Sequence, residues 1–226
     1  MRIMCVGDSM TIGRSGDYTW RYRMWRHLSA TYPRPHRFVG PRWGLHDPVT
    51  DGPDSSAYAD PAFPEAARCH LAGWGEGWLH MAPVIEDAVR TYRADTLLVS
   101  LGLIDLGFYT DPEQTAENVR RFVAGARAAR PGVRAVLLPV IPNVRAMADP
   151  PFGDQCARFN ELLAKAVADL STPGSPLLLA SEPAGWEIDR ATYDGTHPSA
   201  HGEHLLAAAF ADAMHQAWEV GGPYAR

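Results

Sequence analysis

The chain has few cysteines and no long apolar run. Its three cysteines, Cys5, Cys69 and Cys156, are an odd number without close spacing, which predicts neither a disulfide framework nor a zinc site. We interpret them as small buried hydrophobic residues. No apolar segment approaches the ~20 residues that a membrane-spanning helix needs, so no association with a membrane is expected.

An excess of positive charge is also absent. The 226 residues carry a net charge of -5 at pH 7, which argues against a nucleic-acid partner, since such a partner needs a basic surface. Strand-like sequence starts at the second residue, so no signal peptide is visible and we expect a cytoplasmic protein. A leader already removed would leave no trace, and nothing in the sequence indicates an oligomeric state.

Short apolar runs rich in branched residues alternate with segments of helical period. This alternation predicts βαβ units and a parallel sheet, and a hydrophobic content of 46% suits a single α/β domain over residues 1–226. Five strands are predicted, at residues 2–6, 36–39, 96–101, 133–141 and 177–180.

Helical segments separate these runs. The clearest begins at Asp111, where an N-cap, a proline at the first helical position and the capping-box Gln114 coincide. The predicted helices span residues 18–31, 79–93, 112–130, 154–170 and 199–218. Residues 40–75, rich in Pro, Gly and Asp, are expected to form a long functional or mobile loop.

Two polar motifs lie at opposite ends of the chain. Gly7-Asp8-Ser9 follows the first predicted strand, and Asp194-Gly195-Thr196-His197 precedes the last predicted helix. Each alone is ordinary turn chemistry. In a parallel sheet, however, both motifs would meet at the carboxyl ends of the strands. A serine, a histidine and a carboxylate are the three groups of an activated nucleophile.

With these motifs the sequence resembles the SGNH (GDSL-type) hydrolase superfamily over almost its whole length. Residues 6–11 and 194–198 resemble the first and last family blocks, and residues 14–28, 38–40 and 101–107 resemble a mainly bacterial branch. The resemblance implies a flavodoxin-like three-layer α/β/α sandwich and hydrolysis of esters or acyl groups without metal or organic cofactor. It also implies roles: Ser9 is the nucleophile, His197 the general base and then acid, and Asp194 its orienting carboxylate.

The family stabilises the oxyanion with the N–H of the nucleophile, a glycine N–H and an asparagine side chain. Here the N–H groups would come from Ser9 and, by family spacing, from Gly77 or else Gly75. The family's Gly-x-Asn-Asp reads Gly102-Leu103-Ile104-Asp105, so Ile104 replaces the asparagine. Loss of one such donor typically lowers turnover by ~10² to 10³.

Three outcomes of this replacement remain open. Two backbone donors could suffice for an activated acyl group, such as a thioester or aryl ester. Asn143, after the fourth predicted strand, could supply the missing hydrogen bond, although a plain loop residue is the simpler interpretation. Hydrolysis could also have been lost.

Further residues are candidates for contact with substrate. Asp8 and Ile104 adjoin the nucleophile and the oxyanion hole, and Trp74 and Trp78 lie next to the oxyanion glycines, where aromatic rings could stack on a substrate. Arg14 could bind a carboxylate or phosphate or simply face solvent. His197, His201 and His204 lack the accompanying Glu spacing of a metalloprotease, so the latter two are interpreted as helix-surface residues and no metal is expected.

The sequence therefore predicts a cofactor-independent serine hydrolase that acts on a small-molecule or carbohydrate ester through an acyl-Ser9 intermediate. An acyltransferase would share the first half-reaction and cannot be separated from a hydrolase by sequence. A binding protein that has lost catalysis is the third hypothesis, and Ile104 is its only support.

Overall fold

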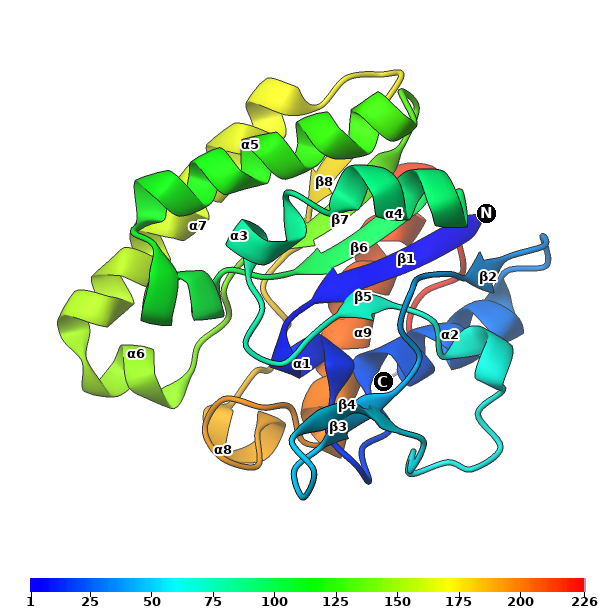
Figure 1. Cartoon of the computed structure of the whole chain (residues 1–226), viewed down its shortest axis with the longest axis horizontal. Coiled ribbons are helices and arrows are strands. Elements are labelled where there is room, and N and C mark those ends of the chain that lie inside the picture. The colour runs from blue at the N-terminus through cyan, green and yellow to red at the C-terminus, as the bar shows by residue number, and fades with distance from the viewer. Residues whose placement is uncertain (226) are drawn as a thin grey trace.

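A parallel sheet forms the centre of the computed structural model, which describes residues 1–225 (Figure 1). Its strands are β1 (Arg2–Gly7), β2 (Arg37–Phe38), β5 (Leu71–Ala72), β6 (Thr96–Ser100), β7 (Arg134–Leu138) and β8 (Leu177–Leu179). The main path runs β2-β1-β6-β7-β8, and β5 pairs with the end of β1. The residues of β6 are buried throughout, as expected for a strand covered on both faces.

This strand order is the flavodoxin-like order of a doubly wound sheet. The five predicted strands are all present, so the predicted fold class is confirmed, and β5 adds a short sixth strand. Two strands are shorter than predicted by two residues or more: residues 133–141 contain only the five-residue β7, and residues 36–39 contain only β2.

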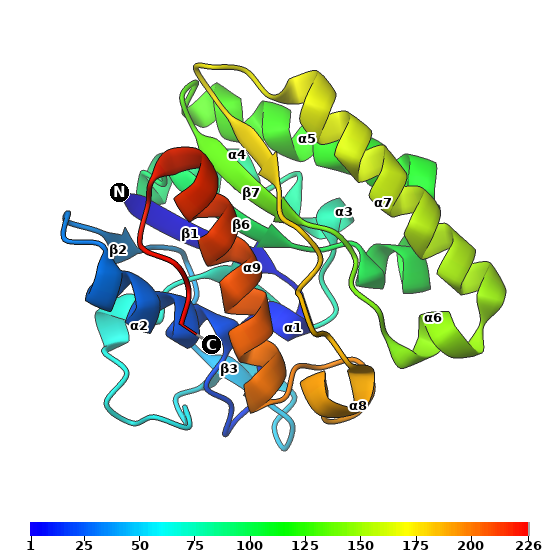
Figure 2. The ribbon, with the colours of Figure 1, turned by 180° about the vertical axis from the view of Figure 1, so that it is seen from behind.

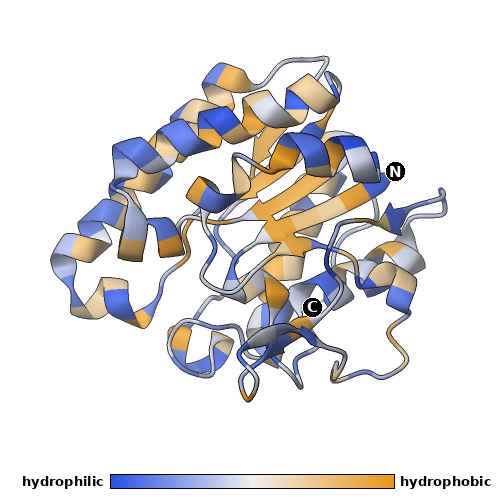
Figure 3. Cartoon of the chain, viewed as in Figure 1, coloured by the Kyte–Doolittle hydropathy of each residue, from blue (hydrophilic) through white to orange (hydrophobic). Residues whose placement is uncertain are grey.

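Helices cover both faces of the sheet. One layer contains α3 (Trp78–Met81), α4 (Ile85–Tyr92), α5 (Pro112–Ala129) and α7 (Pro150–Leu170), and the other contains α2 (Trp20–Thr31) and α9 (Ala200–Trp218). Figure 2 shows α9 lying across the back of the sheet beside α2. The strands are strongly hydrophobic and the outward helix faces polar (Figure 3). No helix in residues 1–225 is long and apolar enough to span a membrane.

The predicted helix over residues 79–93 is two helices, α3 and α4. They are separated at Pro83, whose ring removes a backbone donor and disfavours helical geometry in the residue before it. By contrast, α5 begins as predicted, because the side chain of Asp111 accepts a hydrogen bond from Gln114 N at 2.7 Å.

Residues 40–75 contain more structure than the predicted loop. They form the antiparallel hairpin of β3 (Leu45–Asp47) and β4 (Gly52–Ser55), a short 3₁₀ helix at Glu65–Ala67 and β5. A second hydrophobic cluster holds this segment against α2; its buried residues are Tyr22, Leu45, Tyr58, Phe63 and Ala67. Periodicity did not reveal these elements because each strand is only two to four residues long.

Arg21, on α2, ties this segment to the start of the chain. Its side chain is fully buried, and its guanidinium donates to the carbonyl oxygens of Thr11, Ile12 and Arg68 and to the hydroxyl of Tyr58. These bonds satisfy a buried cation with backbone dipoles. They fix the segment that follows β1 and α1 (Ser9–Ile12).

The carboxyl ends of the parallel strands share one edge of the sheet. The segments that follow them include α1, the π-helical turn η2 (Asp105–Tyr109), α6 (Val144–Ala148) and α8 (Ile188–Ala191). In Figure 1 the arrow of β1 points toward the side of the molecule where α1, α3 and α6 lie. Ligands of open α/β sheets bind at this edge.

Candidate active site

Ser9 is held where β1 turns into α1. The side chain of Asp8 caps this helix, accepting a hydrogen bond from Met10 N at 3.0 Å. A Cβ on Gly7 would lie only 2.0 Å from Thr11 Oγ1, so the turn tolerates no side chain there. Ser9 is 5% exposed, and the tight turn places it at the carboxyl end of the strand.

Asp194 and His197 lie in the loop between α8 and α9. Oδ1 of Asp194 accepts backbone hydrogen bonds from Thr196 N at 3.0 Å and His197 N at 2.8 Å, which leaves Oδ2 to face the imidazole Nδ1 at 2.7 Å. Partial burial acts to raise the pKa of Asp194, but the hydrogen bonds from His197 outweigh it and lower that pKa. The carboxylate is therefore ionised and fixed against Nδ1.

The two motifs meet across the edge of the sheet. His197 Nε2 lies 2.9 Å from Ser9 Oγ, although 188 residues separate them in the chain. Because Nδ1–H donates to Asp194, Nε2 carries a lone pair and can accept a hydrogen bond from the Ser9 hydroxyl. The geometry is that of a nucleophile, a base and an orienting carboxylate.

Two aromatic rings stack on the His197 imidazole. Trp74 stacks on it at 4.8 Å between ring centroids and Tyr193 at 5.7 Å. Trp74 also stacks on His46 at 4.2 Å between ring centroids, and the Arg14 guanidinium lies 4.0 Å from the centre of the Tyr193 ring. Trp74 nevertheless remains 40% exposed, and its contact with substrate stays a prediction. Tyr193 and His46 were not among the predicted site residues, although Tyr193 directly precedes Asp194.

A cavity of about 420 Å³ opens beside Ser9. Seven predicted site residues line it: Asp8, Ser9, Trp74, Gly75, Ile104, Asn143 and His197. Arg14 and Trp78 do not. The rest of the wall comprises Leu103, Phe108, Tyr109, Arg145, Phe152 and Thr196. Thr196 stands within the second polar motif, and for the others the sequence offered no signal apart from their closeness to Ile104 and Asn143.

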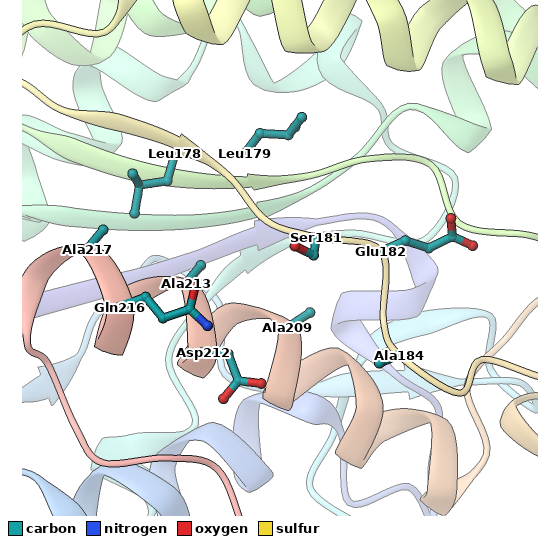
Figure 4. Close-up of a pocket in the computed structure, with 10 residues that line it drawn as sticks. All are labelled: Leu178, Leu179, Ser181, Glu182, Ala184, Ala209, Asp212, Ala213, Gln216 and Ala217. Carbon is teal, nitrogen blue, oxygen red and sulfur yellow. The ribbon is translucent and has the colours of Figure 1, made fainter.

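A second cavity, of about 320 Å³, lies between β8 and α9 (Figure 4). It is lined by small residues of α9 together with Ser181, Glu182 and Asp212. No histidine lines it, so Ser181 has no imidazole base there, and the candidate active site is the cavity at Ser9.

The glycine segment of residues 73–77 differs in detail from expectation. The N–H of Gly77 donates to His80 Nδ1 at 3.1 Å, so Gly77, the favoured oxyanion donor, is already engaged. Gly75 lines the cavity with a φ of +71°, and its N–H has no hydrogen-bond partner within residues 1–225. Of the two predicted glycines, Gly75 is therefore the one with a free donor beside Ser9.

Asp105 explains why the chain needs glycine at position 77. Its carboxylate accepts hydrogen bonds from Trp78 N at 2.8 Å and Leu79 N at 3.0 Å, and a Cβ on Gly77 would lie 2.3 Å from Oδ2. These bonds satisfy free N–H groups at the start of α3 and join the segment of residues 102–105 to the glycine segment.

Two other predicted substrate contacts have structural roles. Trp78 is fully buried and packs edge-on against Phe122 in the core, so it does not contact substrate. The Asn143 side chain caps α6, accepting from Ala146 N at 3.0 Å, and its amide donates to Ile141 O at 3.2 Å. Ile104 lines the cavity and contributes an apolar side chain at the position where the family has asparagine.

Asp8 is an unusual carboxyl group for a position next to a nucleophile. It is 1% exposed, and Oδ2 is buried without a hydrogen-bond partner. Burial raises the pKa of Asp8 to about 7, and the nearby Asp105 contributes in the same direction. Although Asp8 lines the cavity, its carboxyl is held inside the turn, so it positions Ser9 and does not reach toward a ligand.

No three His, Cys, Asp or Glu side chains within residues 1–225 cluster to hold a metal ion. His204 contacts the hydroxyl of Tyr224 through Nδ1 at 3.0 Å, and His201 is exposed. The three cysteines are free, and Cys5 and Cys156 are buried.

Comparison with known proteins agrees with this geometry. The model of the GDSL-like lipase/acylhydrolase family matches residues 5–205. The chain belongs to this family. Membership makes it a carboxylic ester hydrolase, and the resemblance inferred from the two motifs is confirmed. A sequence search against curated proteins found no significant match.

Solved structures of similar fold include several esterases. A carbohydrate esterase of family 3 from Talaromyces cellulolyticus is 23% identical with a TM-score of 0.76, and covers 96% of this chain and 97% of its own. An acetyl esterase mutant determined with an acetate ion is 22% identical, with a TM-score of 0.75 and the same coverage. An acetylxylan esterase from Geobacillus stearothermophilus is 15% identical with a TM-score of 0.68, covering 100% and 96%. These likenesses show the shared fold.

The raised pKa of Asp8 predicts a pH-dependent stability. Between its ordinary pKa of 3.8 and about 7, folded Asp8 keeps a proton that unfolded Asp8 has released, so stability falls as pH rises through this range. Asp8→Asn preserves the shape and the cap but cannot ionise. The stability of the variant relative to wild type should rise by about 2 to 3 kcal/mol from about pH 5 to pH 8, measured by urea unfolding.

Asp169→Asn is the matched control, because Asp169 is exposed and its hydrogen bonds to Lys165 and Arg120 lower its pKa. It should show no gain between these pH values. A constant difference between Asp8→Asn and wild type would contradict a proton held by folded Asp8.

Proposed function

We propose that the protein is a cofactor-independent serine ester hydrolase that works through an acyl-Ser9 intermediate. The observation that supports this proposal is the chain of hydrogen bonds from Asp194 through His197 to Ser9, at 2.7 and 2.9 Å. Ser9 and His197 both line an open cavity. Family membership gives the reaction class, and the hydrogen bonds among these three residues support the serine mechanism.

In the first half-reaction Ser9 Oγ attacks the ester carbonyl carbon while His197 Nε2 takes the hydroxyl proton. The tetrahedral intermediate collapses when His197 returns that proton to the departing alkoxide, so an alcohol leaves and the acyl group stays on Ser9. Water then repeats the sequence, with His197 again as base and then acid, and the carboxylic acid is released. Asp194 stabilises the imidazolium that forms twice in the cycle.

The negative charge on the carbonyl oxygen is proposed to be met by two backbone donors, the N–H groups of Ser9 and Gly75. Neither has a partner within residues 1–225, and both residues line the cavity. Ile104 contributes no donor at the position where the family has asparagine. Asn143 is not assigned to the oxyanion hole, because its side chain already caps α6.

The proposed substrate is an ester of a small molecule or carbohydrate. A cavity of about 420 Å³ holds more than an acetyl group, and its exposed Phe108 and Tyr109 offer apolar surface at the entrance. The esterase and carbohydrate esterase neighbours favour the same class. His197 lies within hydrogen-bond distance of both Ser9 and Asp194. This arrangement favours catalysis over a binding role, because binding alone needs no proton transfer between these groups.

Ser9→Ala should lower kcat for p-nitrophenyl acetate by at least ~10³, since it removes the nucleophile, and Asp194→Asn by about 10³ to 10⁴, since it disturbs the imidazole tautomer. The thermal unfolding midpoint of Ser9→Ala should stay close to that of wild type. Ser181→Ala, in the cavity between β8 and α9, is the matched control and should retain full activity.

Ester hydrolysis retained by Ser9→Ala would overturn the nucleophile. Product analysis with added alcohols separates the remaining alternative, because an acyltransferase would form the new ester in preference to the free acid.

Ile104→Asn should raise kcat on simple esters by about 10² if the new amide donates to the oxyanion, the gain being comparable to the loss seen when such a donor is removed. Ile104→Val, which keeps an apolar wall, should leave kcat within about twofold because it adds no donor. Slower turnover by Ile104→Asn would show that the apolar side chain shapes the acyl site.

A further inference from the structure

Arg145 extends from α6 into the wall of the cavity that contains Ser9. Its guanidinium lies 4.0 Å from the centre of the Phe152 ring and donates through Nη1 to Gly107 O at 3.2 Å. A Cβ on Gly107 would lie 2.9 Å from the same Nη1, so a side chain there would displace the guanidinium. Arg145, from α6, thus contacts both η2 and α7.

The contacts leave one edge of the guanidinium unused. Only Nη1 has a hydrogen-bond partner within residues 1–225, and no carboxylate of those residues forms an ion pair with Arg145. The Nε and Nη2 donors therefore remain free. Two parallel N–H groups of this kind match the two oxygens of a carboxylate.

The other charges in the cavity do not oppose an anion. Asp8 is the one carboxyl among the residues that line it, and the buried turn that holds Asp8 favours its neutral form. The Asp194 carboxylate is engaged by His197. Arg145 is thus the dominant charge of this cavity, in a chain whose net charge is -5.

Two phenylalanine rings lie near the Arg145 guanidinium. Phe152 lies beneath it and the exposed Phe108 lies 5.7 Å from it, measured to the ring centre. Arg145 is itself exposed, so its free donors are accessible to an anion that enters the cavity. A hydrocarbon or aryl spacer would pack on the rings between the ester and the anion.

We propose that Arg145 is a specificity determinant that binds a carboxylate carried by the substrate, so that the preferred substrates are anionic esters with an apolar spacer. This inference rests on the proposed ester hydrolase function and names its substrate class. The carboxylate could belong to the acyl part or to the alcohol part of the ester. One pair of substrates tests each of these possibilities.

Two matched substrate pairs test the proposal. For the alcohol part, 4-acetoxybenzoate is compared with neutral 4-acetoxybenzamide, and for the acyl part, mono-4-nitrophenyl adipate is compared with its methyl ester. In at least one pair, Arg145→Gln should lower kcat/KM for the anionic member at least about tenfold more than for the neutral member, which corresponds to about 1.4 kcal/mol. Most of the effect should be in KM.

Arg158→Gln is the matched control. Arg158 is exposed on α7 and pairs with Glu113 and Glu161, so the variant makes the same change in net charge outside the cavity. It should leave both pairs unaffected. Arg145→Lys should recover part of the discrimination, because an ammonium keeps the charge but loses the two-pronged geometry.

Equal losses for anionic and neutral esters in both pairs, or equal effects of the two Gln variants, would overturn the proposal. If the enzyme cleaved no ester at all, calorimetric binding to the Ser9→Ala protein would still decide. 4-Acetamidobenzoate should then bind at least about tenfold more tightly than 4-acetamidobenzamide, and Arg145→Gln should abolish the difference. Equal affinities would refute the carboxylate site independently of the reaction.

Discussion

The hydrogen bond between Ser9 Oγ and His197 Nε2 is the contact on which the rest of this structure depends. It closes a loop of 188 residues between the first strand and the last turn before α9. A parallel sheet makes this possible because the segments that follow its strands share one edge. If the two groups were about an ångström further apart, the proton transfer that defines the mechanism would lose its geometry.

Much of the surrounding structure holds that contact in place. Asp8 fixes the turn that presents Ser9, while Asp194 uses one oxygen on backbone N–H groups and the other on the imidazole. Trp74 and Tyr193 both stack on the ring of His197. Each group of the triad is therefore held by bonds to its own loop as well as by the other members, which is the basis of a preorganised site.

The sequence could predict the features that local chemistry determines. The apolar runs identified the strands, Asp111 and Gln114 marked the start of α5, and the two polar motifs identified Ser9, His197 and Asp194. It could not predict whether Gly75 or Gly77 has a free N–H, because that depends on the contact of Gly77 with His80.

Other features depend on packing between distant segments. Trp78 and Trp74 are equally close to the glycines in sequence, yet one is in the core against Phe122 and the other is beside His197. The role of Arg145 has no local signature either, since its partners Gly107 and Phe152 come from different elements. Such residues become visible only when the side chains are placed together in space.

The central claim is that His197 activates the Ser9 hydroxyl, and covalent labelling with a fluorophosphonate tests it most directly. Intact-mass spectrometry of the wild-type protein should show one adduct, and peptide mapping should place it on Ser9. Replacement of His197 by alanine should slow labelling by at least ~10³. A wild-type protein that stays unlabelled after prolonged exposure, or labels as fast without the imidazole, would contradict the account.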